Sequence, residues 1–165
     1  MNKVNKTRLI VLIVIICANI ALDQISKAIV RSEIGFQEQI SIIENHFILT
    51  RVENTGAFLS AGDSLPGIIR LLLLTALPVV VLGYGLYFLI SNKNLPTQMQ
   101  VGISFLIGGG VGNIYDRIVH GSVTDFLFLD LGIFRTGIFN VADMSIMVGI
   151  GLLLLQSFQK KKLIS

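Results

Sequence analysis

The chain has 165 residues, of which 53% are hydrophobic and only 14% are charged, and its net charge is +3. This balance excludes an ordinary water-soluble domain and predicts one membrane domain over residues 1–165, all-α apart from a small sheet. The basic residues lie at the chain ends and beside apolar segments, so they do not indicate a nucleic-acid partner.

Four apolar stretches approach the length of about 20 residues that a helix needs to cross a bilayer. They cover about residues 9–30, 67–90, 99–118 and 138–158. The first follows basic residues as a signal peptide would, but it continues into DQISKAIV without a cleavage site of small residues. We therefore expect all four stretches to be retained as transmembrane helices.

The charges at the ends of these stretches predict their direction. Residues 1–8, 91–98 and 159–165 carry seven basic side chains and no acidic one. An excess of Lys and Arg marks the cytoplasmic side of a membrane protein. We expect both termini to be cytoplasmic, and the longer connections, about residues 31–66 and 119–137, to lie outside.

The two outer connections have the composition of short strands. The segment QISIIENHFILTRVENTGAFLS is rich in β-branched and aromatic residues with partial alternation, and SVTDFLFLDLGIFRTGIF is similar. Gly132 and Gly137 are predicted turn positions in the second connection. These patterns predict a small extracytoplasmic β-sheet region that lies against the bilayer.

Four aspartates reach a similar depth near the outer ends of the spans: Asp23, Asp116, Asp125 and Asp143. At a rise of about 1.5 Å per residue, Asp23 lies roughly 21 Å along the first span, and Asp116 is similarly far along the third. Asp143 lies near the outer start of the fourth span, and Asp125 follows the third. Ionisable groups at such depth are costly and are candidates for function.

The neighbouring polar residues have helical spacing. Asn113, Asp116 and Arg117 stand at i, i+3 and i+4 on the third span, and Asn140 and Asp143 stand at i and i+3 on the fourth. Each group therefore shares one helix face. We expect a polar cluster where these faces meet.

The members of this cluster also have interpretations that need no catalysis. Asp23 with Lys27 is explained equally well as an i, i+4 ion pair near the surface. Asp116 is better explained as a residue that holds helices together. Asn140 and Asp143 fit an N-cap and a first-turn acid, which is compatible with either interpretation.

Other residues exclude several kinds of site. Gly108 and Gly112 form a small-xxx-small pair that lets helices approach, without the Lys-Ser/Thr of a phosphate loop. His46 and His120 lack ligand-like spacing, so we expect no metal. Cys17 lies within the first span and is expected to be a small packing or lipid-facing residue.

Elimination then leaves acid–base chemistry. The sequence has no G-x-S-x-G elbow and no H-E-x-x-H motif, and no His lies at the depth of the single cysteine. Two carboxyls that share a site do not easily both ionise, so one keeps a proton while the other activates water. This chemistry of aspartic peptidases requires no cofactor. The residues alone leave the choice of pair open.

Five short motifs together resemble one known family. They are DQISK (residues 23–27), ENTGAF (53–58), GNIYDR (112–117), VTDF (123–126) and FNVADMS (139–145). Their order and spacing, and the number of spans, are similar to those of the lipoprotein signal peptidase family, signal peptidase II. The resemblance covers nearly the whole chain.

The resemblance implies roles for particular residues. Asp125 and Asp143 would be the catalytic dyad, and Asp116 would support the cluster. The residues that would line the substrate site are Asp23, Asn54, Gly56, Asn113, Arg117 and Asn140.

The resemblance also implies a substrate and a location. The substrates would be prolipoproteins whose signal peptide ends at a diacylglyceryl-modified cysteine, cut before that cysteine at the outer face of the bacterial cytoplasmic (inner) membrane. Membrane lipids and cyclic-peptide inhibitors of the globomycin type would be further partners. The main alternative is a small channel or transporter subunit, although the inner halves of the spans are nearly bare of polar residues. A scaffold protein paired through Gly108 and Gly112 is another.

Overall fold

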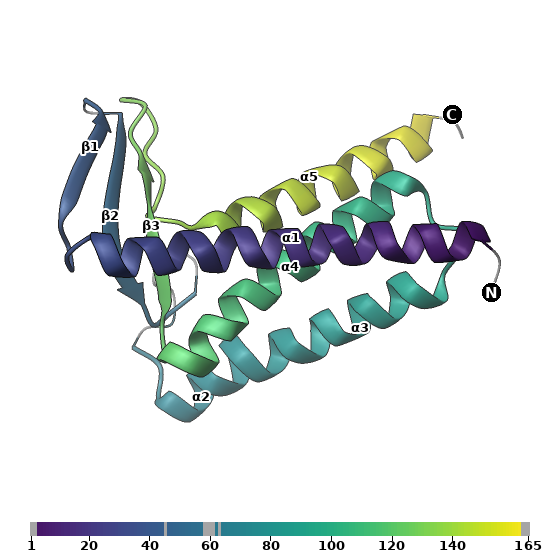
Figure 1. The fold of residues 1–165 in the computed structure, drawn as a ribbon, viewed down its shortest axis with the longest axis horizontal. Helices are drawn as coiled ribbons and strands as arrows, with labels where there is room; N and C mark the ends of the chain where they lie inside the picture. Colours follow the sequence, from purple (N-terminus) through teal and green to yellow (C-terminus); the bar gives the residue numbers. More distant parts are fainter. Residues whose placement is uncertain (1–2, 45, 58–61, 63, 163–165) are drawn as a thin grey trace.

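The computed structural model describes residues 3–44, 46–57, 62 and 64–162, and Figure 1 shows long helices with a small sheet at one end. The helical segments are α1 (Lys3–Glu33), α2 (Gly67–Leu71), the π-helical turn η2 (Leu72–Ala76), α3 (Leu77–Ser91), α4 (Thr97–His120) and α5 (Val141–Lys162). The strands are β1 (Gln39–Ile43), β2 (Phe47–Asn54) and β3 (Val123–Leu129). The mostly helical fold with a small sheet is therefore confirmed.

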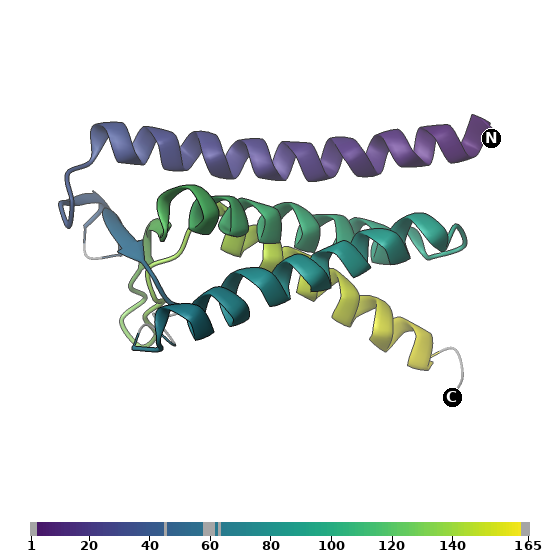
Figure 2. The same ribbon diagram turned by 90° about the horizontal axis from the view of Figure 1, so that it is seen from below.

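The long helices place their ends in two groups. The start of α1, the α3–α4 connection and the end of α5 lie at one end of the molecule, and the sheet lies at the other (Figure 1). Turned by 90°, the same arrangement places α1 along one side of the other helices (Figure 2). The basic segments identified in the sequence thus lie together, away from the sheet.

Three helices in the described part of the chain are long and apolar enough to cross a membrane: Lys6–Glu33, Gly67–Ser91 and Val141–Gln159. The chain is therefore a multi-pass membrane protein. Many large apolar side chains on these helices are exposed, including Leu22 at 62% and Val80 at 67%. Such surfaces suit contact with lipid rather than water.

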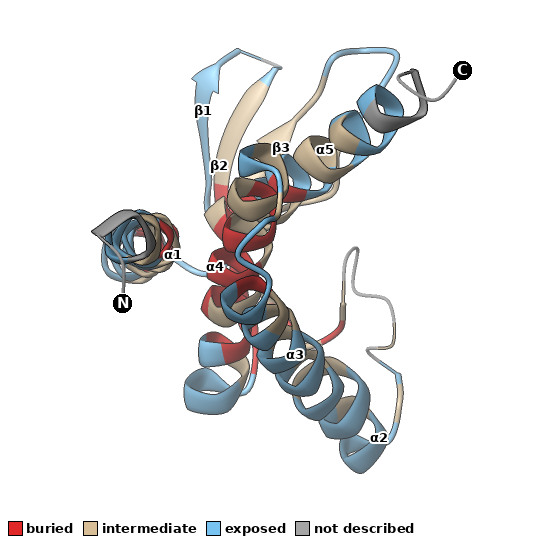
Figure 3. Cartoon of the chain, turned by 90° about the vertical axis from the view of Figure 1, so that its right-hand side faces the viewer, coloured by how far each residue is buried: buried red, intermediate tan, exposed pale blue. Residues whose placement is uncertain are grey.

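Helix α4 differs from the other three because it is the buried centre of the bundle. Figure 3 shows its buried residues between α1, α3 and α5. Polar side chains on its inner faces are buried, among them Ser104 and Asn113. A helix that other helices surround does not need an apolar surface facing lipid, which explains why α4 is not one of the three apolar helices named above.

Glycines let α4 pack closely on both sides. A Cβ atom on Gly108 would lie 2.6 Å from the Asn19 Cβ in α1, and one on Gly109 would collide with the Ala142 carbonyl in α5. The expected close approach at Gly108 is confirmed. The partner helix belongs to the same chain, as small-residue packing in a membrane bundle predicts.

The second predicted span is not one regular α-helix. The short helix α2 leads into η2, and Pro78 is in the first turn of α3. Proline has no N–H to donate, and its ring collides with the carbonyl four residues earlier, so the helix widens at this point. The expected span is therefore helical from Gly67 to Ser91, with one π-helical turn inside it.

The sheet has the order β1-β2-β3 and both strand pairs are antiparallel. Its register pairs Val52 with Asp125 and Asn54 with Val123. Helix α4 ends because Gly121 adopts a φ of 78°, which turns the chain directly into β3. The charged end of this helix therefore lies against the sheet.

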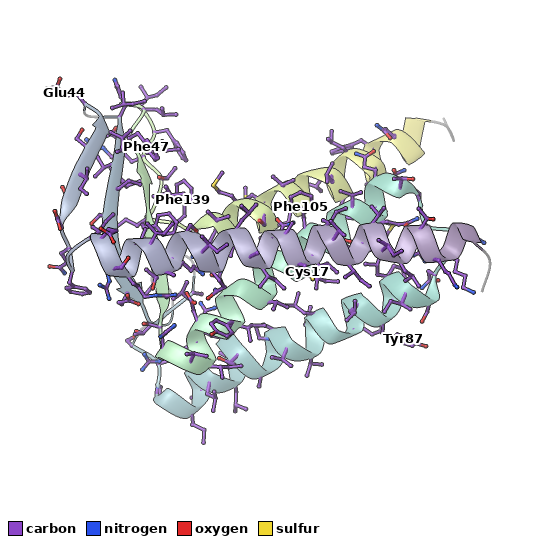
Figure 4. All side chains as sticks on the ribbon, viewed as in Figure 1. Cys17, Glu44, Phe47, Tyr87, Phe105 and Phe139 are labelled. Carbon is purple, nitrogen blue, oxygen red and sulfur yellow. The ribbon has the colours of Figure 1, made fainter. Side chains whose placement is uncertain are left out.

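Two predicted details near α5 are wrong. The fourth helix begins at Val141 rather than near residue 138, because Phe139 forms a bridge with Leu127 of β3. Figure 4 labels Phe139 between β3 and α5. Gly132 has a φ of 78° and is a turn position, whereas Gly137 lies in the irregular segment that leads to this bridge.

Candidate active site

Asp125 and Asp143 line one small cavity near the junction of the sheet and the helices. Asp125 comes from β3 and Asp143 from the first turn of α5. The cavity has a volume of about 20 Å³, and Asn54, Asn113 and Arg117 also line it. A cavity of about 10–15 Å³ is enough for one water molecule when polar groups surround it.

Four N–H donors hold the two carboxylates. Asp125 Oδ1 accepts from Asn140 Nδ2 at 2.6 Å, and its Oδ2 accepts from Asn54 Nδ2 at 2.9 Å. Asp143 Oδ1 accepts from Asn113 Nδ2 at 2.8 Å, and its Oδ2 accepts from the Asn140 backbone at 3.2 Å. Every carboxylate oxygen of the pair therefore has a donor, which fixes the orientation of both side chains.

Asn140 and Asp143 also form the start of α5. The Asn140 Oδ1 accepts from the Asp143 backbone N–H at 2.9 Å, and Asp143 returns the bond to the Asn140 backbone. This reciprocal pair is a capping box, which satisfies two backbone donors at a helix start. The predicted N-cap and first-turn acid are confirmed, and capping itself fixes the position of Asp143.

Burial changes the acidity of Asp125, whose residue is 3% exposed. Loss of water around the carboxyl raises its pKa to about 6, and the nearby Asp143 acts in the same direction, whereas the hydrogen bonds from Asn54 and Asn140 and the charge of Lys27 lower it. The direction agrees with the apolar run FLFL that follows Asp125 in the sequence. Burial thus favours the protonated form of Asp125.

A buried ionic layer lies behind the predicted pair Asp125 and Asp143. Lys27 Nζ lies 2.9 Å from Asp23 Oδ2 and 3.0 Å from Asp116 Oδ2, and all three side chains are fully buried. The ion pair of Asp23 with Lys27 therefore exists, but the prediction that it lies near the surface is wrong. Helix α4 covers the pair because Gly112 leaves room for the Asp23 carboxylate.

Asp23 lies behind the cavity, where it helps to hold the dyad helix. Its Oδ1 accepts from the backbone N–H of Ala142 at 2.9 Å, so a carboxylate from α1 caps the first turn of α5. Among the predicted substrate-site residues, Asn54, Asn113 and Arg117 line this cavity, whereas Asp23, Gly56 and Asn140 do not. Asp23 acts on the dyad through the position of α5.

Arg117 and Gly56 connect the loop after β2 to the cavity. Arg117 Nη2 donates to the Gly56 carbonyl at 2.8 Å, and the Gly56 N–H donates to Asn54 Oδ1 at 2.9 Å. In the described part of the chain, Arg117 Nε is buried without a hydrogen-bond partner. An unused donor at the wall of the cavity is available to an oxygen atom of a ligand.

Sequence reasoning missed several members of the polar network. Gln24 donates to both Asp23 and Asp116, at 3.0 and 3.1 Å. Glu53 accepts from Ser122 at 2.8 Å and pairs in the sheet with Thr124, whose hydroxyl donates to the same carboxylate at 3.2 Å. Only the position of Gln24 and Glu53 inside the quoted motifs could have indicated these contacts.

Two larger apolar cavities adjoin Asp143. One, of about 400 Å³, is lined by Ala57, Leu74, Pro78, Asn113, Arg117, Asp143, Ile146 and Met147. The other, of about 430 Å³, is lined by Phe134, Arg135, Thr136, Gly137, Phe139, Asp143, Met144 and Met147. Asp143 and Met147 are common to both, so apolar ligand groups on either side can reach the same carboxylate.

The other candidate groups lie apart from this site. Cys17 is exposed near the middle of α1, as Figure 4 shows, and its expected role as a lipid-facing residue fits this position. His46 Nδ1 is 2.9 Å from the Asp130 carbonyl. Among the described residues, no group of three or more His, Cys, Asp and Glu side chains could hold a metal ion.

Comparison with known proteins connects this geometry to one family. Residues 15–159 match the family model described as Signal peptidase (SPase) II. The lipoprotein signal peptidase of Syntrophus aciditrophicus is 32% identical over 141 residues, which are 86% of this chain and 88% of the relative. That of Brevibacillus brevis is 37% identical (84% and 89%), and that of Halothermothrix orenii is 36% identical (93% and 96%).

Two solved structures are similar over most of their length. One, titled a bacterial membrane enzyme structure by the in meso method at 2.3 Å resolution, superposes with a TM-score of 0.82 at 26% identity, over 92% of this chain and 89% of that one. A second with the same title at 1.9 Å resolution has a TM-score of 0.79 at 28% identity, over 88% and 91%.

Proposed function

Because the chain belongs to the signal peptidase II family, we propose that it removes the signal peptide from diacylglyceryl-modified prolipoproteins by cutting before the lipidated cysteine. We further propose that it is an aspartic endopeptidase with Asp125 and Asp143 as the dyad. The observation that carries this assignment is the cavity of about 20 Å³ that both carboxyls line, which has room for one water molecule.

In the proposed reaction, Asp143 is the ionised base and Asp125 is the protonated acid. Asp143 takes a proton from the water molecule while the water oxygen attacks the scissile carbonyl carbon. Asp125 gives its proton to the carbonyl oxygen. The tetrahedral intermediate then collapses. Asp143 returns its proton to the leaving cysteine nitrogen as the C–N bond breaks, and Asp125 recovers its proton from the intermediate.

The acidity of Asp125 fits this role. A pKa of about 6 leaves roughly a tenth of the free enzyme with this carboxyl protonated at pH 7. Substrate that expels water from the cavity desolvates the carboxyl further and increases that fraction. Arg117 lines the cavity, and its buried Nε–H, which has no hydrogen-bond partner, could donate to a substrate carbonyl after a small rearrangement of the side chain.

The apolar cavities fit the two apolar parts of the substrate. A signal peptide and a diacylglyceryl group both enter from the bilayer, and cavities of about 400 and 430 Å³ meet at Asp143. An apolar cyclic peptide of the globomycin type would compete for the same space. Membrane lipids would occupy the outer surfaces of the helices.

The chain is proposed to cross the bacterial inner membrane four times, with both termini in the cytoplasm. Helix α4 has 24 residues, about 36 Å at 1.5 Å per residue, which is enough to cross the hydrocarbon core. Its position inside the bundle supports a fourth span in spite of its polar residues. The position of the basic ends opposite the sheet supports an outer location for the dyad.

Family membership leaves the channel or transporter alternative without support. The test of the proposed function is cleavage of a lipidated precursor by the purified protein in detergent. Wild type is expected to release the signal peptide, and Asp125→Asn and Asp143→Asn are each expected to leave the precursor uncleaved while still folding. Each substitution leaves one carboxyl without the partner that holds the complementary proton state. Near-normal cleavage by either variant would exclude this dyad.

A further inference from the structure

Lys27 has no role in the proposed reaction, yet it is one of the largest fully buried side chains in the described part of the protein. It lies on α1, behind the residues that line the dyad cavity. An ammonium group at this depth is expensive unless several partners hold it. Two of its partners are the carboxylates of the buried ionic layer, and the third is the side chain of Asn113 at 2.9 Å.

The contact with Asn113 decides how that amide is oriented. A carboxamide has one acceptor oxygen and one donor nitrogen, whereas an ammonium group can only donate. The Asn113 oxygen must therefore face Lys27, and its NH₂ group then faces Asp143, to which it donates at 2.8 Å. Asn140 donates to the same Asn113 oxygen at 3.2 Å.

The same amides connect Lys27 to the second carboxyl. Asn140 Nδ2, which donates to the Asn113 oxygen, also donates to Asp125 at 2.6 Å. Rotation of the Asn113 amide by 180° would turn its NH₂ toward two donors and its oxygen toward a carboxylate. The hydrogen bonds around both aspartates thus depend on one lysine that is not in the cavity lining.

We propose that Lys27 is a positioning residue for the dyad, which holds the Asn113 amide in the orientation that donates to Asp143. This inference rests on the proposed function of Asp125 and Asp143. Because Lys27 is in the lining of neither the dyad cavity nor the apolar cavities, its loss should affect the reaction step more than substrate binding.

The charge of Lys27 adds an effect that a purely structural residue would not have. The charged groups around Asp125 are Asp143 from α5, Arg117 from α4 and Lys27 from α1, and the Lys27 charge lowers the Asp125 pKa. Removal of Lys27 should therefore raise that pKa further. Since Asp125 is the acid, the fall in activity at alkaline pH should move to higher pH.

The experiment compares Lys27→Met, Lys27→Met/Asp116→Asn and Asp116→Asn with wild type. Lys27→Met leaves buried carboxylates without their cation and is expected to lower the melting temperature. The double variant removes the Lys27 cation together with the Asp116 carboxylate, so it should recover part of the lost melting temperature. Asp116→Asn keeps Lys27, and with it the contact to Asn113.

Both variants without Lys27 should lose about 10- to 100-fold in kcat with KM within about twofold, since small misplacements of reacting groups have effects of this size. Infrared titration of isotope-labelled Asp, with Asp125→Asn as the reference, should place the Asp125 midpoint higher in the double variant than in Asp116→Asn. An unchanged midpoint, or kcat that follows melting temperature across all three variants, would overturn the inference.

The controls separate this inference from the proposed function. If wild type cleaves, Asp125→Asn does not, and the double variant has wild-type kcat, only the role of Lys27 is wrong. If wild type does not cleave the lipidated precursor, the proposed function is wrong. The Asp125 midpoint still tests the inference in that case, because it is measured without substrate.

Discussion

Substitution of Gly112 by alanine tests whether the contact between α1 and α4 positions the dyad. A methyl group at this position would lie 2.5 Å from Asp23 Oδ2 and 3.1 Å from Asp23 Cγ. The carboxylate oxygen would have to move by about 1 Å to reach ordinary van der Waals contact. That movement would stretch its bonds to Lys27, at 2.9 Å, and to the Ala142 N–H, at 2.9 Å.

The magnitude follows from these contacts. Overpacking a tight interface typically costs about 1–3 kcal/mol, and loss of a hydrogen bond to a charged group costs about 1.5–3 kcal/mol. Replacement of glycine within a helix returns up to about 1 kcal/mol. We expect Gly112→Ala to destabilise the protein by about 2–4 kcal/mol. Because Asp23 caps the helix that carries Asp143, we also expect kcat to fall by about 10- to 100-fold.

A matched control lies two residues earlier on the same helix. A methyl group on Gly110 would also lie 2.5 Å from its nearest atom, but that atom is Cδ1 of Leu82, the end of a flexible side chain. Gly110→Ala should therefore change stability by less than about 1 kcal/mol. Thermal unfolding in detergent and cleavage of a lipidated precursor would measure both variants. Equal losses in the two variants, or wild-type stability in Gly112→Ala, would refute the role of the Asp23 contact.

Three further predictions concern acidity, inhibitors and orientation. Asp125 must be protonated to act as the acid, so kcat/KM should fall as pH rises above about 6. Asn54→Val removes a hydrogen bond that lowers the Asp125 pKa, so this fall should move to higher pH, and a shift to lower pH would contradict the assignment. Chelators and thiol reagents should leave the cleavage activity intact, and Cys17→Ala should change it little because Cys17 is exposed on α1. Loss of activity to a chelator and its recovery on addition of metal would overturn this prediction. In a Cys17→Ala background, a cysteine at Glu38 should react with an impermeant reagent outside intact spheroplasts and one at Lys93 should not; the reverse labelling would place the sheet in the cytoplasm.

The sequence was sufficient for the parts of the fold that follow from length and alternation. The apolar stretches predicted α4 to within two residues at each end, whereas α1 begins six residues before its predicted start and α5 begins three residues after its own. The β-branched runs predicted the sheet. Helix α4 is not one of the three helices that are apolar enough to cross a membrane, because other helices rather than lipid cover its surface. The start of α5 was misplaced because Ile138 and Phe139 are apolar for a different reason: their segment bridges to β3 rather than entering the helix.

The site was predictable in its members more than in its contacts. Helical spacing and depth brought Asn113 and Asp143 to one place, and they do share a hydrogen bond. Spacing on α1 alone could not reveal that Lys27 is buried, because the residues that cover it come from α4. The orientation of an amide between two groups is likewise a property of three helices together, so no local pattern records it.

The hydrogen bond from Ala142 to Asp23 spans 119 positions of the chain. During synthesis the first helix enters the membrane early, and its carboxylate can pair with Lys27 of the same helix but lacks the Ala142 N–H until the last helix follows. If Asp143 is the base, as proposed, it is held in position only after the first and last helices of the fold have joined.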